Sequence, residues 1–354
     1  MRTFFLCLFF LFYTLPTEGN CFEKVVIWGH KLHTHTHSYI HNAFYKAFTH
    51  MGYTTHWFDD QDQLSNFDFS KTLFITEGQV DKNIPLRQDC RYILHNCDEV
   101  KYQALLQNRR CIKLDTYKDF ILQQKGLTKI APCIYSNIKT KTIYMPWATD
   151  LLPHEIDAIK KQVPLFKKEK KCQWVGTIGY GLYGNKPELD GYIRGCDQYW
   201  IPFYNSDPWL KGIDLQEHIR LIQSAYMAPA IVGRWQKENG YIPCRLFKNI
   251  SYGQMGITNS YRAYLLFGKK VIYHPHTYQL FFKAHQHLEK MQPQELYVLM
   301  DFVKKKHTFI NRIKVLLRFM REVERQKYIP YSSAIPAEPK MPEPLNGVTE
   351  ASPG

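Results

Sequence analysis

Two periods of apolar residues alternate along the chain, and their alternation predicts an α/β protein. Short apolar runs at 25–28, 54–58, 72–76, 92–95 and 111–114 are typical of buried strands. Between the first two runs, apolar residues recur every three or four positions, which predicts a helix over about 38–51 that ends at Gly52. Strands that alternate with helical stretches favour a parallel sheet.

The second half of the chain predicts another unit of the same kind. Strands are expected at 173–178, 230–233, 257–259 and 271–273. Helices are expected after Asn185, from Asp214 to about Tyr226, over 278–288 and over 293–323. The stretch 240–260 predicts a helix that begins near Pro243, stops at Gly253 and is followed by a short buried strand.

These patterns predict two Rossmann-like α/β domains, with a helical C-terminal segment and a disordered tail. The expected divisions are a signal peptide or short anchor (1–19), an N-terminal α/β domain (20–150), a partly helical linker (151–171), a second α/β domain (172–290), C-terminal helices (291–330) and the tail (331–354). The tail is rich in proline and poor in large apolar residues, which is typical of disorder.

The N-terminal segment predicts export. Arg2 precedes an apolar run from Phe4 to Tyr13, which is shorter than the roughly 20 residues of a membrane span. A cleaved signal peptide is favoured over an uncleaved anchor, so we expect the secretory pathway or cell envelope. Removal of Cys7 would leave an even number of cysteines, which permits disulfides, but their scatter forms no recognisable framework.

Charge narrows the class of partner without fixing it. The 354 residues carry a formal net charge of +14, which suits a polyanion, an anionic membrane surface or a phosphorylated small molecule. The basic residues are spread along the chain and form no nucleic-acid recognition motif, so we expect no nucleic-acid partner.

Histidines crowd the loop after the first predicted strand. In open α/β sheets, ligands bind beyond the carboxyl ends of the strands, and this loop lies there. Three interpretations stay open: a metal site, which lacks an accompanying carboxylate or cysteine cluster; a general base; or a polar loop without chemistry. The residues concerned are His30, His33, His35, His37 and His41, of which His35 and His37 are the candidates for substrate contact.

Acidic and polar residues follow the next strands. Asp60-Gln61-Asp62 matches the short Asp-x-Asp pattern of metal-dependent sugar transferases, although an acidic surface loop explains it better. Glu77 and His95 end two further strands, where they would either line the same cleft or serve only in turns.

The second domain offers two candidate phosphate-binding features. A glycine-rich loop between a strand and a helix lets backbone N–H groups approach a phosphate, although its spacing matches neither GxGxxG nor the Walker pattern. The helix after Pro243 carries Arg245 in its first turn and Lys248 one turn later. A helix N-terminus attracts anions, and an arginine can grip a phosphate bidentately. A solvated basic face explains the same residues without function.

The order of these features resembles the donor domain of GT-B glycosyltransferases, in particular the CgeB-like group. The resemblance covers about residues 172–290. It rests on the loop from Val175 to Asn185, the run Arg245-Leu246-Phe247-Lys248, then Gly253, then Ile257-Thr258-Asn259, and finally the apolar segment 265–273. Lys248 stands where many relatives carry a glutamate that holds the donor ribose, so the nucleotide stays open.

The resemblance implies a glycosyltransferase that moves a sugar from a nucleotide-sugar donor to a glycan, lipid or protein acceptor. It implies an N-terminal acceptor domain that faces a C-terminal donor domain across a cleft, with no metal and no cofactor. Independently of the resemblance, the basic run within 151–171 allows contact with a membrane surface, although a solvated surface explains it better. His35 or His37 would contact the acceptor as a base. The implied donor-binding residues are Gly176, Gly179, Gly184, Asn185, Arg245, Lys248, Asn249, Gly253, Asn259 and Ser260.

Two other functions stay open at this point. A GT-A-like transferase would hold a manganese or magnesium ion with Asp60 and Asp62. A non-catalytic protein that binds glycans or anions would keep the same fold without turning over a donor.

Overall fold

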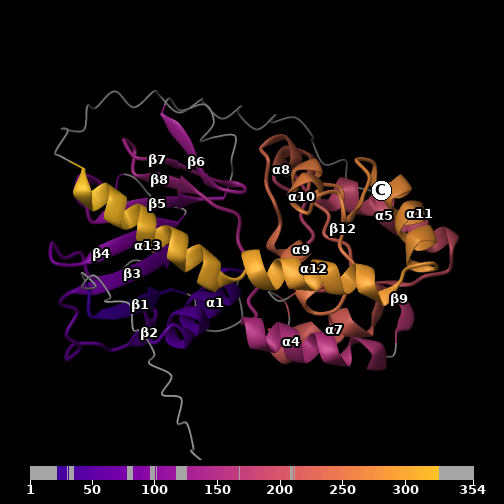
Figure 1. The fold of residues 1–354 in the computed structure, drawn as a ribbon, viewed down its shortest axis with the longest axis horizontal. Helices are drawn as coiled ribbons and strands as arrows, with labels where there is room; N and C mark the ends of the chain where they lie inside the picture. The colour runs from indigo at the N-terminus through magenta and orange to yellow at the C-terminus, as the bar shows by residue number, and fades with distance from the viewer. Residues whose placement is uncertain are drawn as a thin grey trace, which may run out of the picture.

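The computed structural model describes residues 22–326 except 30, 32–35, 78–82, 96–99, 101, 117–125, 167, 208–209 and 211 (Figure 1). The predicted signal segment, the predicted disordered tail and His35 therefore lie outside the described residues. Two α/β units lie side by side along the long axis (Figure 1).

The first unit is built on an eight-stranded sheet in the order β2-β1-β3-β4-β5-β8-β7-β6. Neighbours from β2 to β8 are parallel, while β7 is antiparallel to β8 and to β6. The strands are β1 (Lys24–Trp28), β2 (Thr55–Phe58), β3 (Thr72–Glu77), β4 (Arg91–His95), β5 (Cys111–Asp115), β6 (Leu127–Ala131), β7 (Ile134–Asn137) and β8 (Thr142–Tyr144).

Both faces of this sheet are covered, which is why its central strands read as unbroken apolar runs. On one face, Val25, Ile27 and Ile75 pack against α1 (Thr36–His50) and α13 (Phe309–Arg325). On the other, Val26 and Phe74 pack with residues near α2 (Gln103–Leu106). α1 ends before Gly52, whose φ of 85° suits glycine, as predicted.

The second unit holds a shorter parallel sheet. β9 (Glu169–Val175) lies between β10 (Phe203–Ser206) and β11 (Ala225–Met227), while β12 (Ile257–Thr258) pairs with β13 (Ile272–Tyr273). An isolated parallel bridge between Ala230 and Thr258 brings the chain that follows β11 beside β12. The strand predicted at 230–233 was therefore wrong in position, because β11 begins at Ala225 and only Ala230 of that run forms a bridge.

Helices surround this second sheet. They are α4 (Pro153–Gln162) with the 3₁₀ turn η1 (Val163–Leu165), α5 (Lys186–Gln198), α7 (Leu215–Ser224), α8 (Arg234–Glu238), α9 (Cys244–Ser251), α10 (Tyr261–Leu266), α11 (Thr277–Leu288) and α12 (Pro293–Lys306). Pro243 is the N-cap of α9, and Gly253 follows its end with a φ of 94°. No helix among the described residues is both long and apolar enough to cross a membrane.

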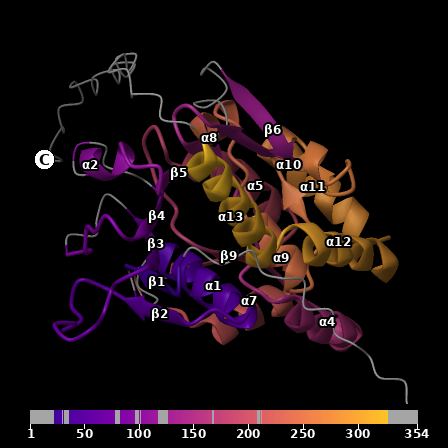
Figure 2. The same cartoon turned by 60° about the vertical axis from the view of Figure 1, so that its left-hand side comes forward.

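The chain passes between the units twice. The helix predicted over 293–323 is broken at His307-Thr308, so α12 packs on the second unit and α13 returns to the first, as both views show (Figure 2). Thr149 and Thr308 form a parallel bridge where the two passages meet. Buried Arg312 stabilises this junction by donating hydrogen bonds to the carbonyls of Pro146 and Trp147.

Candidate functional site

The carboxyl edge of the second sheet contains a topological switch point. The chain leaves β9 for β10 on one side and later reaches β11 on the other, so the strand order reverses at β9. Ligands of open α/β sheets bind beyond the carboxyl ends of the strands at such a reversal. The loop that follows β9 is the glycine-rich loop predicted from the sequence.

Three glycines of this edge sit where a side chain has no room. A Cβ on Gly176, whose φ is 137°, would overlap the Arg245 guanidinium. A Cβ on Gly184 would overlap the Gly179 carbonyl, and one on Gly233 would overlap the Gly184 carbonyl. The loop is therefore packed backbone to backbone against the start of α8.

Asn185 ties this loop to the helix that follows it. Its Oδ1 accepts from the Gly179 N–H at 3.0 Å, and it is the N-cap residue of α5. The Lys186 N–H donates in turn to the Gly179 carbonyl at 3.0 Å. Asn185 thus shapes the loop, and the N-terminus of α5 opens directly beyond it.

Arg245 is brought to the same edge from the first turn of α9. Its guanidinium carbon lies 3.7 Å from the centre of the Trp174 ring, and its Nε donates to the Val175 carbonyl at 3.0 Å. The side chain is half-buried, and burial lowers the pKa of its guanidinium. A fixed guanidinium beside Gly176 is suited to bind a phosphate bidentately.

Lys248 has a different partner from the one predicted. Its Nζ lies 2.8 Å from Oδ2 of Asp150 and 4.6 Å from the centre of the Tyr39 ring. Burial would raise the pKa of Asp150, but Lys248 and a 2.6 Å hydrogen bond from Tyr252 outweigh it and lower that pKa. The Lys248 side chain is only 9% exposed, and this buried ion pair is its described charged contact.

His218 lies beside this ion pair. Its ring packs edge-on at 5.8 Å from the Tyr39 ring and 5.4 Å from the Tyr252 ring, measured between centroids. Among the described residues, neither ring nitrogen has a hydrogen-bond partner. Burial, followed by the charge of Lys248, lowers the pKa of His218 to about 3. The ring is therefore neutral in the folded protein across the physiological range.

The remaining predicted donor residues of this region hold the backbone together. Asn259 Oδ1 accepts from the Val232 N–H and its Nδ2 donates to the Val232 carbonyl, both at 2.9 Å. Asn249 donates to the Ala228 carbonyl at 2.8 Å. Ser260 caps α10 by accepting from Ala263 N–H. All three predicted residues are at most 2% exposed, so their described contacts are structural.

The first sheet has its own switch point at β1, which lies between β2 and β3. His37, in the first turn of α1, hydrogen-bonds through Nδ1 to the carboxylate of Glu77, the last residue of β3. A carboxylate only accepts, so Nδ1 carries the proton and Nε2 is the basic nitrogen of the ring. The His37 side chain is 18% exposed and that of Glu77 is 5% exposed.

Two more histidines complete this cluster. His41 Nδ1 faces the Gly29 carbonyl at 2.7 Å, and His41 Nε2 lies 3.1 Å from Nε2 of His95, the last residue of β4. Because a carbonyl only accepts, His41 carries its proton on Nδ1, and His95 donates from Nε2. The His37 and His95 rings are 5.3 Å apart. Strand ends that the sequence singled out, Glu77 and His95, do meet His37.

The aspartates of the predicted Asp-x-Asp pattern point to other partners. Asp60 accepts from the Trp28 indole at 2.9 Å, and Asp62 pairs with Lys31 at 2.8 Å. Among the described residues, no group of three or more histidine, cysteine or acidic side chains is arranged to hold a metal ion. These contacts give the aspartates a role in the loop after β2.

Tyr39 connects the two carboxyl edges. It stands two residues after His37 in α1, its hydroxyl donates to the Ile213 carbonyl, and its ring faces Lys248 of α9. Burial, with Asp150 and Asp214 adding to it, raises the pKa of Tyr39 to about 12. The histidine cluster and the helix that carries Arg245 are thus joined through one buried side chain.

Sequence reasoning missed three contributors to these edges. The sequence pattern predicts only a strand at Trp174, only the end of a strand at Gly233 and only the end of the first domain at Asp150. Glycine after a strand is a usable signal for Gly233. For the pairing of Asp150 with Lys248 the sequence carried no signal.

No protein-family model matches the sequence, and no curated protein matches it. Among solved structures, the fold is similar to an apo structure of OtsA, with 9% identity, a TM-score of 0.40 and 82% of this chain and 78% of that chain covered. It is similar to a UDP-forming α,α-trehalose-phosphate synthase from Burkholderia xenovorans, with 10% identity, a TM-score of 0.41 and coverages of 85% and 74%. It is also similar to an α1,3-fucosyltransferase with GDP-fucose, with 13% identity, a TM-score of 0.37 and coverages of 88% and 93%. Likenesses at this level carry no argument for the activity of this chain.

Proposed function

We propose that the protein is a glycosyltransferase that uses a nucleotide-sugar donor. The observation that carries the proposal is the Arg245 guanidinium, stacked on Trp174 and fixed beside Gly176 at the switch point of the second sheet. A pyrophosphate at this edge would meet a guanidinium, the loop from Gly176 to Asn185, and the N-termini of α5 and α9.

The donor contacts differ from those expected at the outset. Arg245, the glycine loop and Asn185 remain the donor-binding residues. Four of the expected donor residues stabilise the site without contacting the donor, because their described partners are protein groups. They are Lys248, Asn249, Asn259 and Ser260. As the sugar leaves, negative charge develops on the pyrophosphate, and fixed cationic and N–H groups stabilise it.

His37 supplies the base in this proposal. The acceptor hydroxyl attacks the anomeric carbon, its proton passes to His37 Nε2, and the bond to the nucleoside diphosphate breaks with both electrons on the leaving oxygen. Glu77 accepts from His37 Nδ1 and so fixes the orientation of the ring. The acceptor is a glycan, lipid or protein hydroxyl, reached when the two domains close on the donor.

A donor screen with two variants tests this function against simple binding. Wild-type protein is assayed with a panel of nucleotide sugars for release of nucleoside diphosphate. His37→Gln should abolish release while donor binding is retained, and Arg245→Gln should weaken donor binding itself. A protein that binds donors but releases no diphosphate with any acceptor class would instead be a binding protein.

A further inference from the structure

A cavity of about 490 Å³, which we call the β13 cavity, lies at the amino end of β13. It is lined by residues of α10, of the turn before β13, of α11 and of the first turns of α12. β13 runs parallel to β12, so this cavity lies at the opposite edge from the carboxyl ends where the donor site is proposed. None of the residues assigned to the donor site lines it.

Three lysines line the β13 cavity. Lys269 and Lys270 come from the turn before β13, and Lys283 comes from α11. Lys283 Nζ donates to the Tyr273 carbonyl at 3.1 Å, which orients the ammonium group and leaves it further N–H donors. Within the part of the chain that the structure describes, none of the three lysines forms an ion pair.

The acidic residues near the cavity have basic partners of their own. Glu295 of α12 lines the cavity, and its Oε2 lies 3.0 Å from His287 Nε2. Glu289, at the end of α11, pairs with a histidine, and Asp301 of α12 pairs with two lysines outside the cavity. α10 and β13 carry no acidic residue. Three lysines against one carboxylate leave a surplus of positive charge, whichever form His287 takes.

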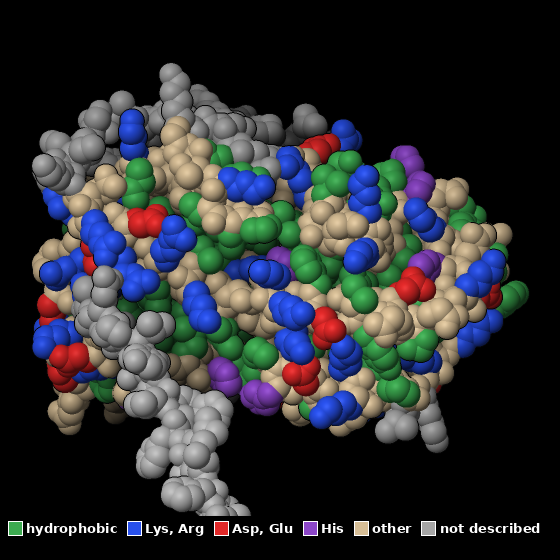
Figure 3. Space-filling model, viewed as in Figure 1, with side chains coloured by type: hydrophobic (Ala, Val, Ile, Leu, Met, Phe, Trp, Pro, Cys, Tyr) green, Lys and Arg blue, Asp and Glu red, His purple; other side chains and the backbone are tan. Residues whose placement is uncertain are grey.

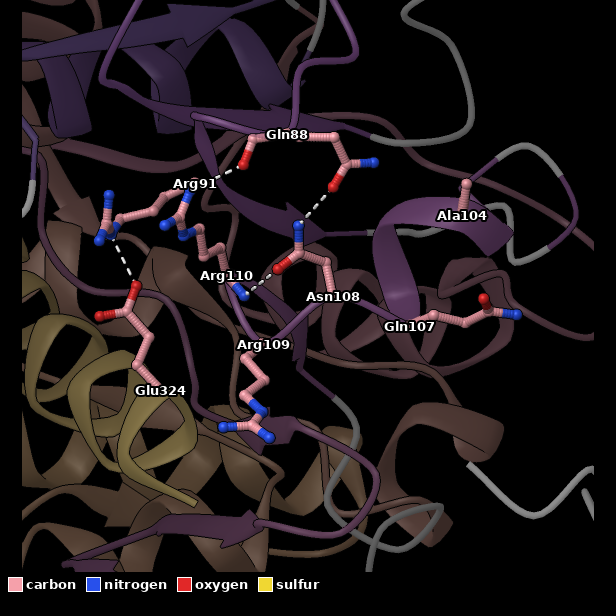
Figure 4. Close-up of a pocket in the computed structure, with 8 residues that line it drawn as sticks. All are labelled: Gln88, Arg91, Ala104, Gln107, Asn108, Arg109, Arg110 and Glu324. Carbon is pink, nitrogen blue, oxygen red and sulfur yellow. Dashed lines mark hydrogen bonds and ion pairs between the residues drawn. The ribbon is translucent and has the colours of Figure 1, made fainter. Parts of the chain in front are cut away.

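A larger cavity at the amino end of β4 provides a contrast (Figure 4). There Glu324 of α13 lies 2.6 Å from Arg91 Nε, and Arg110 donates to the Gln88 carbonyl at 2.8 Å. Protein groups therefore already pair with these arginines, whereas the lysines of the β13 cavity meet no carboxylate.

Apolar side chains line the rest of the β13 cavity. Val271 and Ile272 are buried at its base, Val298 of α12 is 37% exposed, and the Tyr264 ring stacks on a neighbouring tyrosine. Over α10, α11 and α12, Lys and Arg side chains lie among apolar ones (Figure 3). The cavity thus offers positive charge and an apolar wall to the same ligand.

We propose that the β13 cavity binds an organic phosphate, with the phosphate at the lysines and the carbon framework against the apolar wall. The inference is independent of the proposed function, because no donor-site residue takes part. Lysine binds phosphate as a point charge, and charge-assisted hydrogen bonds are the strong class. Apolar walls with a few polar groups, in a cavity of this size, are typical of small-molecule sites.

The test is calorimetric titration of the full-length protein at low ionic strength, with phenyl phosphate and inorganic phosphate as probes. Phenyl phosphate should bind more tightly, because only its ring contacts the apolar wall. Lys283→Gln should weaken the binding of both probes about tenfold, because it removes a charge-assisted contact. Lys290→Gln is the matched control, since it makes the same change of net charge at an exposed lysine that does not line the cavity.

Val298→Ser tests the apolar wall separately from the lysines. It should weaken the binding of phenyl phosphate about threefold and leave that of inorganic phosphate unchanged, because it removes only apolar contact. Lys283 and Val298 are both exposed, so thermal unfolding should show both variants folded.

Arg245→Gln separates the β13 cavity from the proposed donor site. This variant should keep the phenyl phosphate binding that Lys283→Gln weakens. A wild type that binds phenyl phosphate in this way but binds no nucleotide sugar would support the β13 cavity while contradicting the proposed function. The inference is overturned if phenyl phosphate does not bind the wild type, if Lys283→Gln and Lys290→Gln bind it equally, or if Arg245→Gln alone abolishes its binding.

Discussion

Arg245 stacks on Trp174, with its guanidinium carbon 3.7 Å from the centre of the indole ring. The two residues come from different elements, α9 and β9, and their contact fixes a positive charge at the point where the strand order reverses. Gly176 is the residue after β9. It leaves room for the Arg245 guanidinium, because a Cβ at this position would overlap it. One contact thus joins the fold of the second domain to its proposed chemistry.

The glycine loop packs closely against α8, which predicts that a substitution there lowers the free energy of unfolding at some positions and not at others. Gly233→Ala should destabilise the protein by about 1–3 kcal/mol, because a Cβ there overlaps the Gly184 carbonyl and the backbone must move. Gly179→Ala is the control, since its Cβ would lie 3.8 Å from the Gly184 Cα, an ordinary contact. Urea unfolding midpoints measure both, and equal midpoints would show that the loop is not packed as described.

The buried ion pair predicts a large effect of removing one partner. Asp150→Asn keeps an acceptor for Tyr252 but leaves Lys248 buried without its counter-charge, and should cost about 3–5 kcal/mol of unfolding free energy. Adding Lys248→Met should recover much of the loss, because the orphaned charge is gone. Glu238→Gln breaks the exposed pair with Arg234 and should change stability by less than about 1 kcal/mol. A double variant no more stable than Asp150→Asn would contradict this account.

His218 predicts how stability depends on pH. Its folded pKa of about 3 lies below the unfolded value of about 6.5, so the unfolded chain takes up the proton first. Its contribution is therefore fully present above pH 6.5 and is lost as the pH falls from there toward 3. By this linkage the loss reaches about 2 kcal/mol at pH 5.

His218→Phe provides the measurement for this pH dependence. No residue that the structure describes hydrogen-bonds to the ring nitrogens, so a phenyl ring between Tyr39 and Tyr252 should be tolerated at pH 7. Between pH 7 and pH 5 the variant should lose less stability than the wild type in denaturant titrations. Parallel curves for the two proteins would exclude His218 as the titrating group.

The hydrogen bond between His37 and Glu77 predicts a catalytic effect separate from binding. Glu77→Gln keeps the size of the side chain but replaces the carboxylate that accepts from His37 Nδ1 and orients the ring. On the proposed function, kcat should fall by about 10²–10⁴ while the KM for the donor stays nearly constant. Steady-state rates with the best donor test this prediction. An unchanged kcat with an altered KM for the donor would show that Glu77 does not act through the base.

Much of the fold follows from local sequence. The runs at 25–28, 72–76 and 92–95 became β1, β3 and β4 because strands buried on both faces need unbroken apolar residues. β6 escaped prediction because it is an edge strand with exposed positions, and its apolar signal is weak. The strand β11 was predicted at the wrong position because its three residues, Ala225 to Met227, are too few to show a hydrophobic period.

The candidate site was predictable only where backbone geometry decides it. The glycine loop, and the meeting of Glu77 and His95 with His37, follow from the rule that parallel strands end at one edge. The partner of Lys248 could not be inferred, because Asp150 belongs to a passage between domains and meets α9 only through tertiary packing. The sequence pattern therefore placed Lys248 on a basic helix face but could not show that it forms a buried ion pair.

Donor binding by the wild type and by Arg245→Gln tests the central claim most directly. Each protein is titrated calorimetrically with a panel of nucleotide sugars, with Arg220→Gln, which alters an exposed pair with Glu217, as the control. One donor should bind the wild type and the control equally, and bind Arg245→Gln at least about tenfold more weakly. If no nucleotide sugar binds the wild type, or if a folded Arg245→Gln binds one as tightly, the account of this edge as a donor site is contradicted.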